Sequence, residues 1–129
     1  MLRLARALES AGWVRSRADV LEPTEKGERL GLHVLRGHRL WERYLSDEAG
    51  LAMDRLHGAA ERAEHRLDAD EVESLADHLG HPRIDPHGDL IPTAIGEPAP
   101  QERTPLTDWP CHRLAVIVHV EDEPPQALE

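Results

Sequence analysis

Histidines and glutamates recur at helical spacing in the middle of this sequence. His38 and Glu42 are four residues apart, and a second set follows downstream, consisting of His57, Glu61, Glu64 and His65. Residues three or four apart share one face of an α-helix. Imidazole nitrogens combined with carboxylate oxygens suit a divalent transition metal such as Mn²⁺, Fe²⁺, Co²⁺ or Zn²⁺. The pattern therefore indicates a metal site between two helices, and a metal sensor is the leading hypothesis for function.

The second set also has an ordinary interpretation. Glu61, Glu64 and His65 could be polar residues on a solvated helix face, with Arg62 and Arg66 forming helix salt bridges. A metal is favoured by the joint pattern, because two His/Glu groups on neighbouring antiparallel helices converge if the helices pack face to face. The pattern alone leaves both interpretations open.

The remaining histidines carry weaker signals. His87 lies within Pro86-His87-Gly88, where a turn residue is expected. None of the remaining histidines is assigned to a site; they are His33, His78, His81, His87, His112 and His119.

The elements that must position the two His/Glu groups follow from apolar periodicity and chain breakers. A helix over residues 2–11 ends at a glycine, and the two short apolar segments after it predict a β-hairpin. Thr24 suits the N-cap of a long helix that runs to about Asp47. Two shorter helices are predicted, one over about residues 54–67 and one that starts at Asp68 or Asp70 and ends at Leu79. The fold class is therefore mainly α.

The rest of the chain is poor in helix signals. Residues 81–92 are dense in proline and glycine and should be irregular, and residues 93–104 have the composition of a linker. The run from Leu114 to Val120 is the strongest β-strand pattern in the sequence. Because one strand cannot bury itself, residues 105–129 resemble the start of a β-domain that the chain does not complete.

Composition excludes several classes of protein. No apolar run approaches the roughly 20 residues that cross a bilayer, and the N-terminus lacks the apolar core of a signal peptide. The only cysteine, Cys111, excludes an internal disulfide framework and fits a reducing cytoplasm. The sequence has no Gly-rich phosphate loop, no serine nucleophile elbow and no His-Glu-x-x-His run, so we do not expect an enzyme.

Charge is distributed unevenly along the 129 residues, whose net charge is −10. Residues 1–30 hold six basic and five acidic side chains, whereas residues 66–129 hold four and fourteen. An acidic protein binds nucleic acid poorly through charge alone. Contacts with DNA would therefore come from the near-neutral N-terminal third, through Arg3, Arg6, Arg15 and Arg17.

The predicted helix, hairpin and second helix match the second half of a winged helix-turn-helix. In that arrangement the first helix would be the recognition helix, with Arg3 and Arg6 near the DNA and the hairpin as the wing. A generic helix–hairpin–helix scaffold without DNA is the alternative, and the pattern leaves it open.

Three ordered motifs carry a family resemblance: Leu21-x-x-Thr24-x-Lys26-Gly27, the run His38-Arg39-Leu40-Trp41-Glu42-Arg43-Tyr44-Leu45, and Leu56-His57 with Glu61-x-x-Glu64-His65. Together with the stretch from His81-Pro82 through Asp85-Pro86-His87-Gly88 to Ile91-Pro92, they make residues 2–92 resemble the diphtheria-toxin-repressor/manganese-regulator family of metal-dependent transcriptional repressors. Residues 105–125 are similar to the start of the family's C-terminal SH3-like, FeoA-type domain.

The resemblance implies Fe²⁺ or Mn²⁺ as cofactor, a homodimer, and binding to operators that control metal uptake. His38, Glu42 and His57 match one metal-site group of the family, and Glu61, Glu64 and His65 match the other. Glu61 stands where the iron-responsive branch has cysteine and the manganese-responsive branch has glutamate. A hard oxygen donor in that place favours Mn²⁺, while Fe²⁺ remains possible.

The resemblance also implies a domain order. Residues 1–23 would be a partial winged-helix domain, 24–92 the metal-binding and dimerisation domain, 93–104 a linker and 105–129 the start of the SH3-like domain. Family ligands from the first winged-domain helix would precede Met1, so we expect the chain to be the middle part of a longer repressor.

Two other functions remain open. Modules that resemble this helical domain also occur as cytoplasmic extensions of metal-uptake permeases, where the domain would be regulatory and would not bind DNA. Otherwise the chain would be cytoplasmic and independent of the membrane. A purely structural dimerisation domain whose metal site has decayed is the third possibility.

Overall fold

A computed structural model describes residues 2–18, 20–96 and 103–119 of the chain. These residues form four α-helices, a two-stranded sheet and a short 3₁₀ helix. The prediction of a mainly helical chain is therefore confirmed. None of the helices in the described segments is both long and apolar enough to cross a membrane.

The N-terminal end is a helix packed against a hairpin. Helix α1 covers Leu2–Ser10, and the chain turns at Gly12, whose φ of 73° suits glycine. Strands β1, Val14–Arg17, and β2, Val20–Pro23, pair antiparallel. The predicted helix and hairpin are both present.

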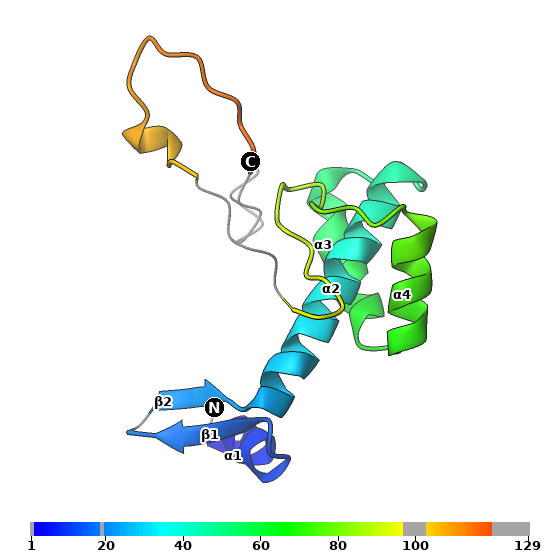
Figure 1. Ribbon diagram of the computed structural model, residues 1–129, viewed down its shortest axis with the longest axis vertical. Coiled ribbons are helices and arrows are strands. Elements are labelled where there is room, and N and C mark those ends of the chain that lie inside the picture. The colour runs from blue at the N-terminus through cyan, green and yellow to red at the C-terminus, as the bar shows by residue number, and fades with distance from the viewer. Residues whose placement is uncertain (1, 19, 97–102, 120–129) are drawn as a thin grey trace.

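Helix α2, Glu25–Asp47, is the 23-residue axis of the molecule. Its N-cap is Thr24, as predicted, and the Thr24 hydroxyl accepts the Gly27 N–H at 3.1 Å. The same hydroxyl donates to the carbonyl of Gly12 at 2.7 Å, which ties the start of α2 to the turn after α1. Figure 1 shows α1 and the hairpin at one end of α2 and the other helices toward its far end.

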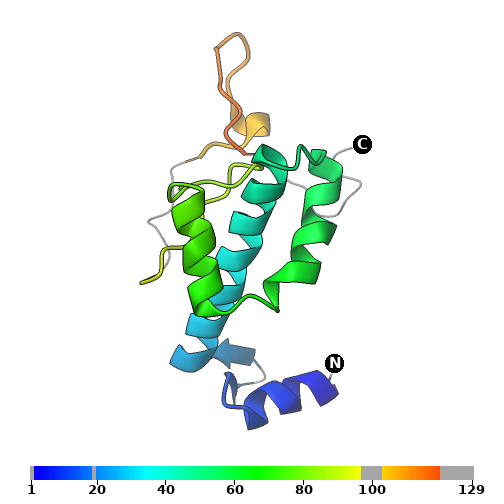
Figure 2. The ribbon, with the colours of Figure 1, turned by 90° about the vertical axis from the view of Figure 1, so that its right-hand side faces the viewer.

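Helices α3, Met53–Glu64, and α4, Ala69–His78, flank α2 on two sides (Figure 2). Leu40 of α2 packs with Val72 and Ala76 of α4 and with Ile91 in a buried core. Asp68 and Glu71 form a reciprocal capping box that fixes the start of α4.

The third helix is shorter than the prediction of residues 54–67. It ends at Glu64, and His65 is its C-cap residue. The α-helical pattern ends there, because the N–H of Arg66 donates to the carbonyl of Ala63, three residues back, at 2.9 Å. His65 therefore lies at the end of the helix and not within it.

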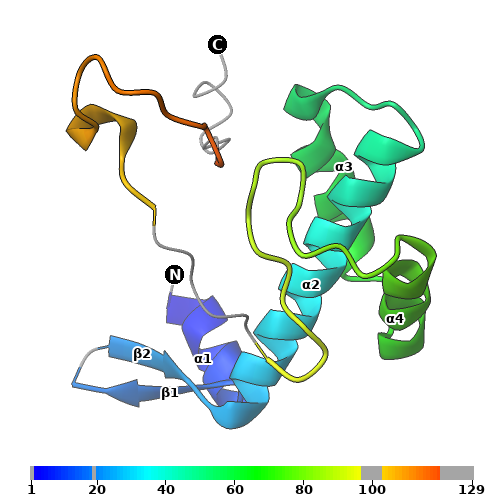
Figure 3. The ribbon, with the colours of Figure 1, turned by 45° about the horizontal axis from the view of Figure 1, so that its top comes forward.

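The segment after α4 has no helix or long strand, as predicted, and returns along α2 (Figure 3). Two arginines of α2 hold it: Arg36 donates to the carbonyl of Pro92 at 2.7 Å and Arg39 to that of Leu90 at 2.5 Å. Ile84 and Leu90 form an isolated antiparallel bridge across it.

The predicted strand over residues 114–120 is wrong for its described part. Residues 114–119 have no strand structure, and Leu114 and Val116 are exposed. A strand needs a partner for its hydrogen bonds, and described residues 103–119 supply none, since they contain only the 3₁₀ helix Leu106–Asp108. Residues 97–102 of the predicted linker and 120–129 of the predicted β-domain lie outside the described residues.

Candidate metal centre

Helix α2 and helix α3 together bring three predicted ligands into one group. His38 and Glu42 lie one helical turn apart on α2, with His38 Nε2 and Glu42 Oε1 separated by 3.1 Å. Packing of α3 on α2 places His57 Nδ1 3.7 Å from the same Glu42 oxygen. One ligand atom from each residue lies within 4.8 Å of the others. His38 and Glu42 are buried, and His57 is partly exposed.

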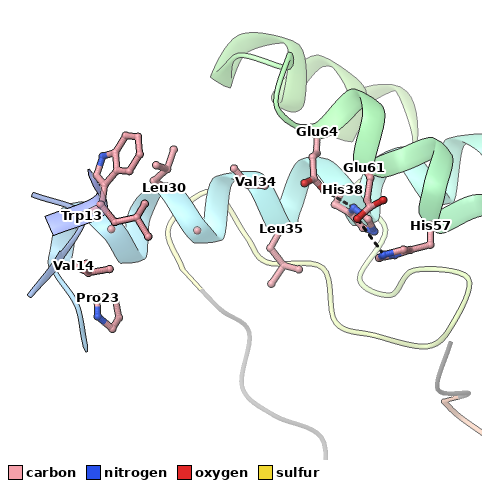
Figure 4. Close-up of a pocket in the computed structure, with 13 residues that line it drawn as sticks. Trp13, Val14, Pro23, Leu30, Val34, Leu35, His38, His57, Glu61 and Glu64 are labelled. Carbon is pink, nitrogen blue, oxygen red and sulfur yellow. Dashed lines mark hydrogen bonds and ion pairs between the residues drawn. The ribbon is translucent and has the colours of Figure 1, made fainter. Parts of the chain in front are cut away.

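The other three predicted ligands line the same region but do not form a second compact group among the described residues. Glu64 Oε2 lies 2.5 Å from His38 Nδ1, so His38 bridges Glu42 and Glu64. Glu61 Oε1 lies 3.8 Å from His57 Nε2, with the Glu61 side chain 62% exposed. His65, 73% exposed, contacts Glu64 at 3.1 Å. Figure 4 shows His38, His57, Glu61 and Glu64 gathered between the two helices.

Electrostatics in this group centre on His38. Burial lowers the pKa of His38, but the hydrogen bonds and charges of Glu42 and Glu64 more than offset it, so the net pKa lies above its ordinary value. A protonated His38 thus partly neutralises two carboxylates. A divalent cation would supply that positive charge in its place.

The donor set fits a first-row divalent metal. His38, Glu42 and His57 offer two imidazoles and a carboxylate, and Glu64 and Glu61 add further carboxylate oxygens next to them. Imidazole and carboxylate bind Mn²⁺, Fe²⁺ and Zn²⁺, and the mixture gives no reason to prefer a soft ion.

Two further groupings were not predicted. Glu42, Asp85 and His87 form a fully buried group, and Glu73, Asp77 and His81 form an exposed one. His87 does lie in a turn, as expected from its neighbours, but it is only 4% exposed and its Nδ1 is 3.7 Å from Glu42 Oε2. No local signal could find this contact, because it joins residues 45 positions apart in the chain.

A groove of about 590 Å³ connects the centre with the N-terminal end of the molecule. Its walls are apolar side chains of α2, among them Leu30 and Val34, together with Val14 and Pro23 of the hairpin and the preceding Trp13, and the candidate ligands His38, His57, Glu61 and Glu64 lie at its other end (Figure 4). Trp13 and Leu30 therefore line the same groove as the candidate centre, at its opposite end.

The four arginines predicted to contact DNA all lie at this N-terminal end and are exposed. Arg3 and Arg6 are on α1, and Arg15 and Arg17 are on β1. Arg15 Nε pairs across the hairpin with Glu22 Oε2 at 3.1 Å. The geometry presents these charges to solvent and does not identify their partner.

Comparison with known families shows to which family the chain belongs. A sequence model described as "Iron dependent repressor, metal binding and dimerisation domain" matches residues 24–93, more than half of the chain. The chain belongs to the iron-dependent repressor family. This confirms the predicted resemblance to the diphtheria-toxin-repressor/manganese-regulator family and the prediction of a divalent metal as cofactor. The family is one of repressors and not of enzymes.

The relatives of this chain include repressors and membrane proteins of metal transport systems. The chain is 41% identical over 89 residues to the iron-dependent repressor IdeR of Mycobacterium tuberculosis (strain ATCC 25618 / H37Rv), covering 68% of this chain and 39% of that protein. It is 36% identical over 85 residues to a probable metal transport system membrane protein of Chlamydia pneumoniae, covering 66% of this chain and 19% of that protein.

A solved structure of a manganese-dependent transcriptional repressor in complex with manganese superposes with a TM-score of 0.84 at 34% identity, covering 98% of this chain and 59% of the other. The manganese regulator SloR gives a TM-score of 0.68 at 31% identity, covering 75% and 45%. The chain thus spans less than two thirds of the length of these relatives.

Proposed function

We propose that the chain is the metal-sensing part of a manganese- or iron-dependent transcriptional repressor that dimerises and controls metal-uptake genes through operator DNA. The observation that carries this proposal is the convergence of His38, Glu42 and His57 to within 4.8 Å inside a segment that matches a metal-binding and dimerisation domain. Glu61, Glu64 and His65 complete the proposed ligand set at the edge of this group.

Mn²⁺ is the proposed cognate ion, with Fe²⁺ as the alternative. Glu61 supplies a hard oxygen donor beside His57, which favours Mn²⁺ over ions that prefer thiolate. The similarity to a manganese-dependent repressor over nearly the whole chain supports this choice.

The DNA-facing part of the proposal is the N-terminal end. We propose that α1 and the hairpin are the recognition-helix end and wing of a winged helix-turn-helix, with Arg3, Arg6, Arg15 and Arg17 contacting DNA. We also propose that residues 93–104 are a linker and that residues 105–129 are the start of an SH3-like domain. Metal between α2 and α3 would fix how the two DNA-reading ends of a cytoplasmic homodimer are spaced.

The deciding experiment is a calorimetric titration of the purified chain with Mn²⁺, and anaerobically with Fe²⁺, with light scattering on the same samples. Three chains are compared: wild type, His57→Ala in the candidate centre, and His81→Ala in the exposed Glu73, Asp77 and His81 group. We expect saturable binding by a dimeric wild type, a loss of about tenfold or more in the His57 variant, about 1.4 kcal/mol, and no change in the His81 variant.

The other half of the ligand set has its own test. Glu64→Ala combined with His65→Ala should remove the gain in thermal stability that Mn²⁺ gives while leaving the metal-free fold nearly intact. If this double variant gains as much stability as wild type, these two residues are not ligands. If wild type itself shows no saturable binding, the chain is a dimerisation domain without a working sensor.

A second function is favoured by one observation, the similarity to a metal transport membrane protein of Chlamydia pneumoniae. In that case the same metal centre would regulate a transporter, and DNA would not be its target. A membrane-spanning reading frame fused in phase with this sequence would support the transporter, whereas metal-dependent retention of promoter DNA would support the repressor.

A further inference from the structure

Helix α1 is attached to α2 without a buried core. Among the described residues, the buried apolar side chains all lie beyond residue 39, in α2, α3, α4 and the segment that follows α4. At the N-terminal end, Leu4 of α1 is 66% exposed. Apolar packing therefore does little to fix the angle between α1 and α2, and polar contacts are left to set that angle.

Helix α1 closes with its own backbone bonds before the chain reaches α2. The N–H of Gly12 donates to the Glu9 carbonyl at 2.9 Å, and the N–H of Trp13 donates to the Leu8 carbonyl at 3.0 Å. Because Gly12 is left-handed, with a φ of 73°, this pair of bonds is a Schellman closure. The carbonyls of Ala11, Gly12 and Trp13 lie beyond the last helical N–H groups and must find other donors.

Residues at the start of α2 donate to all three of these carbonyls. The Trp13 oxygen accepts the N–H of Thr24 at 2.9 Å, and the Gly12 oxygen accepts the Thr24 hydroxyl at 2.7 Å. The Ala11 oxygen accepts the Lys26 ammonium at 3.0 Å, where the negative end of the α1 dipole also favours a cation. The same ammonium lies 5.8 Å from the centre of the Trp13 ring, within range of a cation–π contact. We call residues 11–13, Thr24 and Lys26 the joint.

The Thr24 hydroxyl has two separate tasks in the joint. Its oxygen accepts the Gly27 N–H at 3.1 Å, which caps α2. Its single proton is directed to the Gly12 carbonyl at 2.7 Å, which is nearer than the Trp13 carbonyl at 3.2 Å. Capping requires only an acceptor, so the bond donated to Gly12 serves the attachment of α1.

We propose that Thr24 is a positioning residue for the DNA-reading end, and that Thr24 and Lys26 together fix the angle between α1 and α2. Without their bonds the few residues between the two helices would be a hinge. With the bonds, α1 moves as one body with the helix that carries His38 and Glu42. The use of this rigidity in reading DNA rests on the proposed function, whereas the joint itself requires neither metal nor DNA.

The test measures the distance between spin labels on α1 and α2 by double electron–electron resonance. The labels are placed at Ala7→Cys and Asp47→Cys, both exposed positions, in the full chain with Cys111→Ser. Labelled chain is diluted with unlabelled chain, without metal, so that only distances within one chain are recorded.

Three substitutions of Thr24 separate its two tasks. Thr24→Ser keeps the donor and the acceptor, Thr24→Asp keeps only the acceptor that caps α2, and Thr24→Val keeps neither. We expect a single narrow distance maximum in wild type and in the serine variant. The aspartate and valine variants should lose this maximum and give a broad distribution.

A narrow maximum in the aspartate variant would show that the donated bond is not needed, and a broad distribution in wild type would show that the joint is not rigid. Either result overturns the inference. Failure of wild type to bind Mn²⁺ in the titration above would instead remove the proposed function and leave the joint.

A second pair of variants decides if those of Thr24 lose their helical circular dichroism. Lys26→Met removes the donor to Ala11, and Arg29→Met removes a charge one turn later that pairs only with Glu25 of the same helix among the printed ion pairs of the described chain. Broadening in the Lys26 variant alone supports the joint. Equal distance distributions in the two variants overturn it.

Discussion

At the scale of single residues, Glu42 and His38 decide the charge state of the centre. Glu42 is 2% exposed and faces three imidazoles, those of His38, His57 and His87. Glu64 adds a second carboxylate on the far side of His38. In the metal-free chain, protonation of His38 is the local means of balancing these negative charges.

Stability of the metal-free chain should depend on His38 and on pH. Because the pKa of folded His38 lies above its ordinary value of 6.5, its stabilising effect is present below that value and is lost as pH rises through the folded pKa. With a chelator present, the melting temperature of wild type relative to His38→Gln should therefore fall as the pH is raised from below 6.5 through the folded pKa. A difference that stays constant across the series would contradict this assignment.

Glu61 should tune metal preference without affecting the fold, since its side chain is 62% exposed. Glu61→Cys replaces a hard oxygen by a soft thiolate, so the affinity for Co²⁺ relative to Mn²⁺ should rise by about tenfold or more. Competition titrations measure the ratio. Arg62→Cys places the same thiol on the neighbouring exposed position and should leave the ratio unchanged.

At the scale of secondary-structure elements, the junction between the hairpin and α2 is a close backbone contact. A Cβ placed on Gly27 would lie 1.9 Å from the carbonyl oxygen of Trp13. The same oxygen accepts the N–H of Thr24 at 2.9 Å. Gly27 thus lets the first turn of α2 press against the hairpin.

Gly27→Ala should separate this junction and lower the stability of the chain by roughly 1–3 kcal/mol, the usual cost of overpacking. Gly31, one turn later, has nothing within 4 Å of an added Cβ, so Gly31→Ala should instead stabilise by about 0.5–1 kcal/mol through helix propensity. Thermal denaturation, followed by tryptophan fluorescence, distinguishes the two. Identical effects would mean that the contact with Trp13 does not matter.

The helices could be predicted from the sequence where side chains close in sequence fix their ends. Thr24 and Asp68 cap their helices through their own side chains, so the start of α2 and one of two candidate starts of α4 were found in the sequence. The strand expected over residues 114–120 failed in its described part, because a strand is settled by its partner and not by its own side chains.

The residues of the candidate centre also differ in whether the sequence could predict them. His38 and Glu42 share a helix face by spacing alone, and the pairing of neighbouring helices made His57 a reasonable third member. His65 lies outside the compact group because α3 ends at Glu64. His87 lies near Glu42 because the turn after α4 brings it there. Such long-range contacts leave no local pattern in the sequence.

At the scale of the whole molecule, charge is segregated along the chain. The net charge of −10 arises almost entirely beyond residue 65, while the exposed arginines of α1 and β1 lie at the N-terminal end of α2 (Figure 1). A molecule of this kind would approach DNA with its N-terminal end.

Arg3→Ala combined with Arg6→Ala should weaken binding to duplex DNA and flatten its salt dependence. Each lost phosphate contact reduces the slope of log K against log salt concentration by about 0.9, so two should reduce it by about 1.8. Fluorescence anisotropy with Mn²⁺ present gives the slope. Arg113→Ala removes an exposed charge from the acidic half and should leave the slope as it is; an equal effect would argue against N-terminal DNA contacts.

The length of α2 has a mechanical consequence. From His38 back to Glu25 the helix rises through 13 residue steps, about 20 Å at 1.5 Å per residue. A rigid helix of that length is a lever: a tilt of about 10° at the metal end would carry the hairpin end through about 3.5 Å, close to the 3.4 Å axial spacing of successive phosphates on a DNA strand. If the arginines of α1 contact DNA as proposed, an ion need shift its ligands only slightly to change which phosphates they can reach.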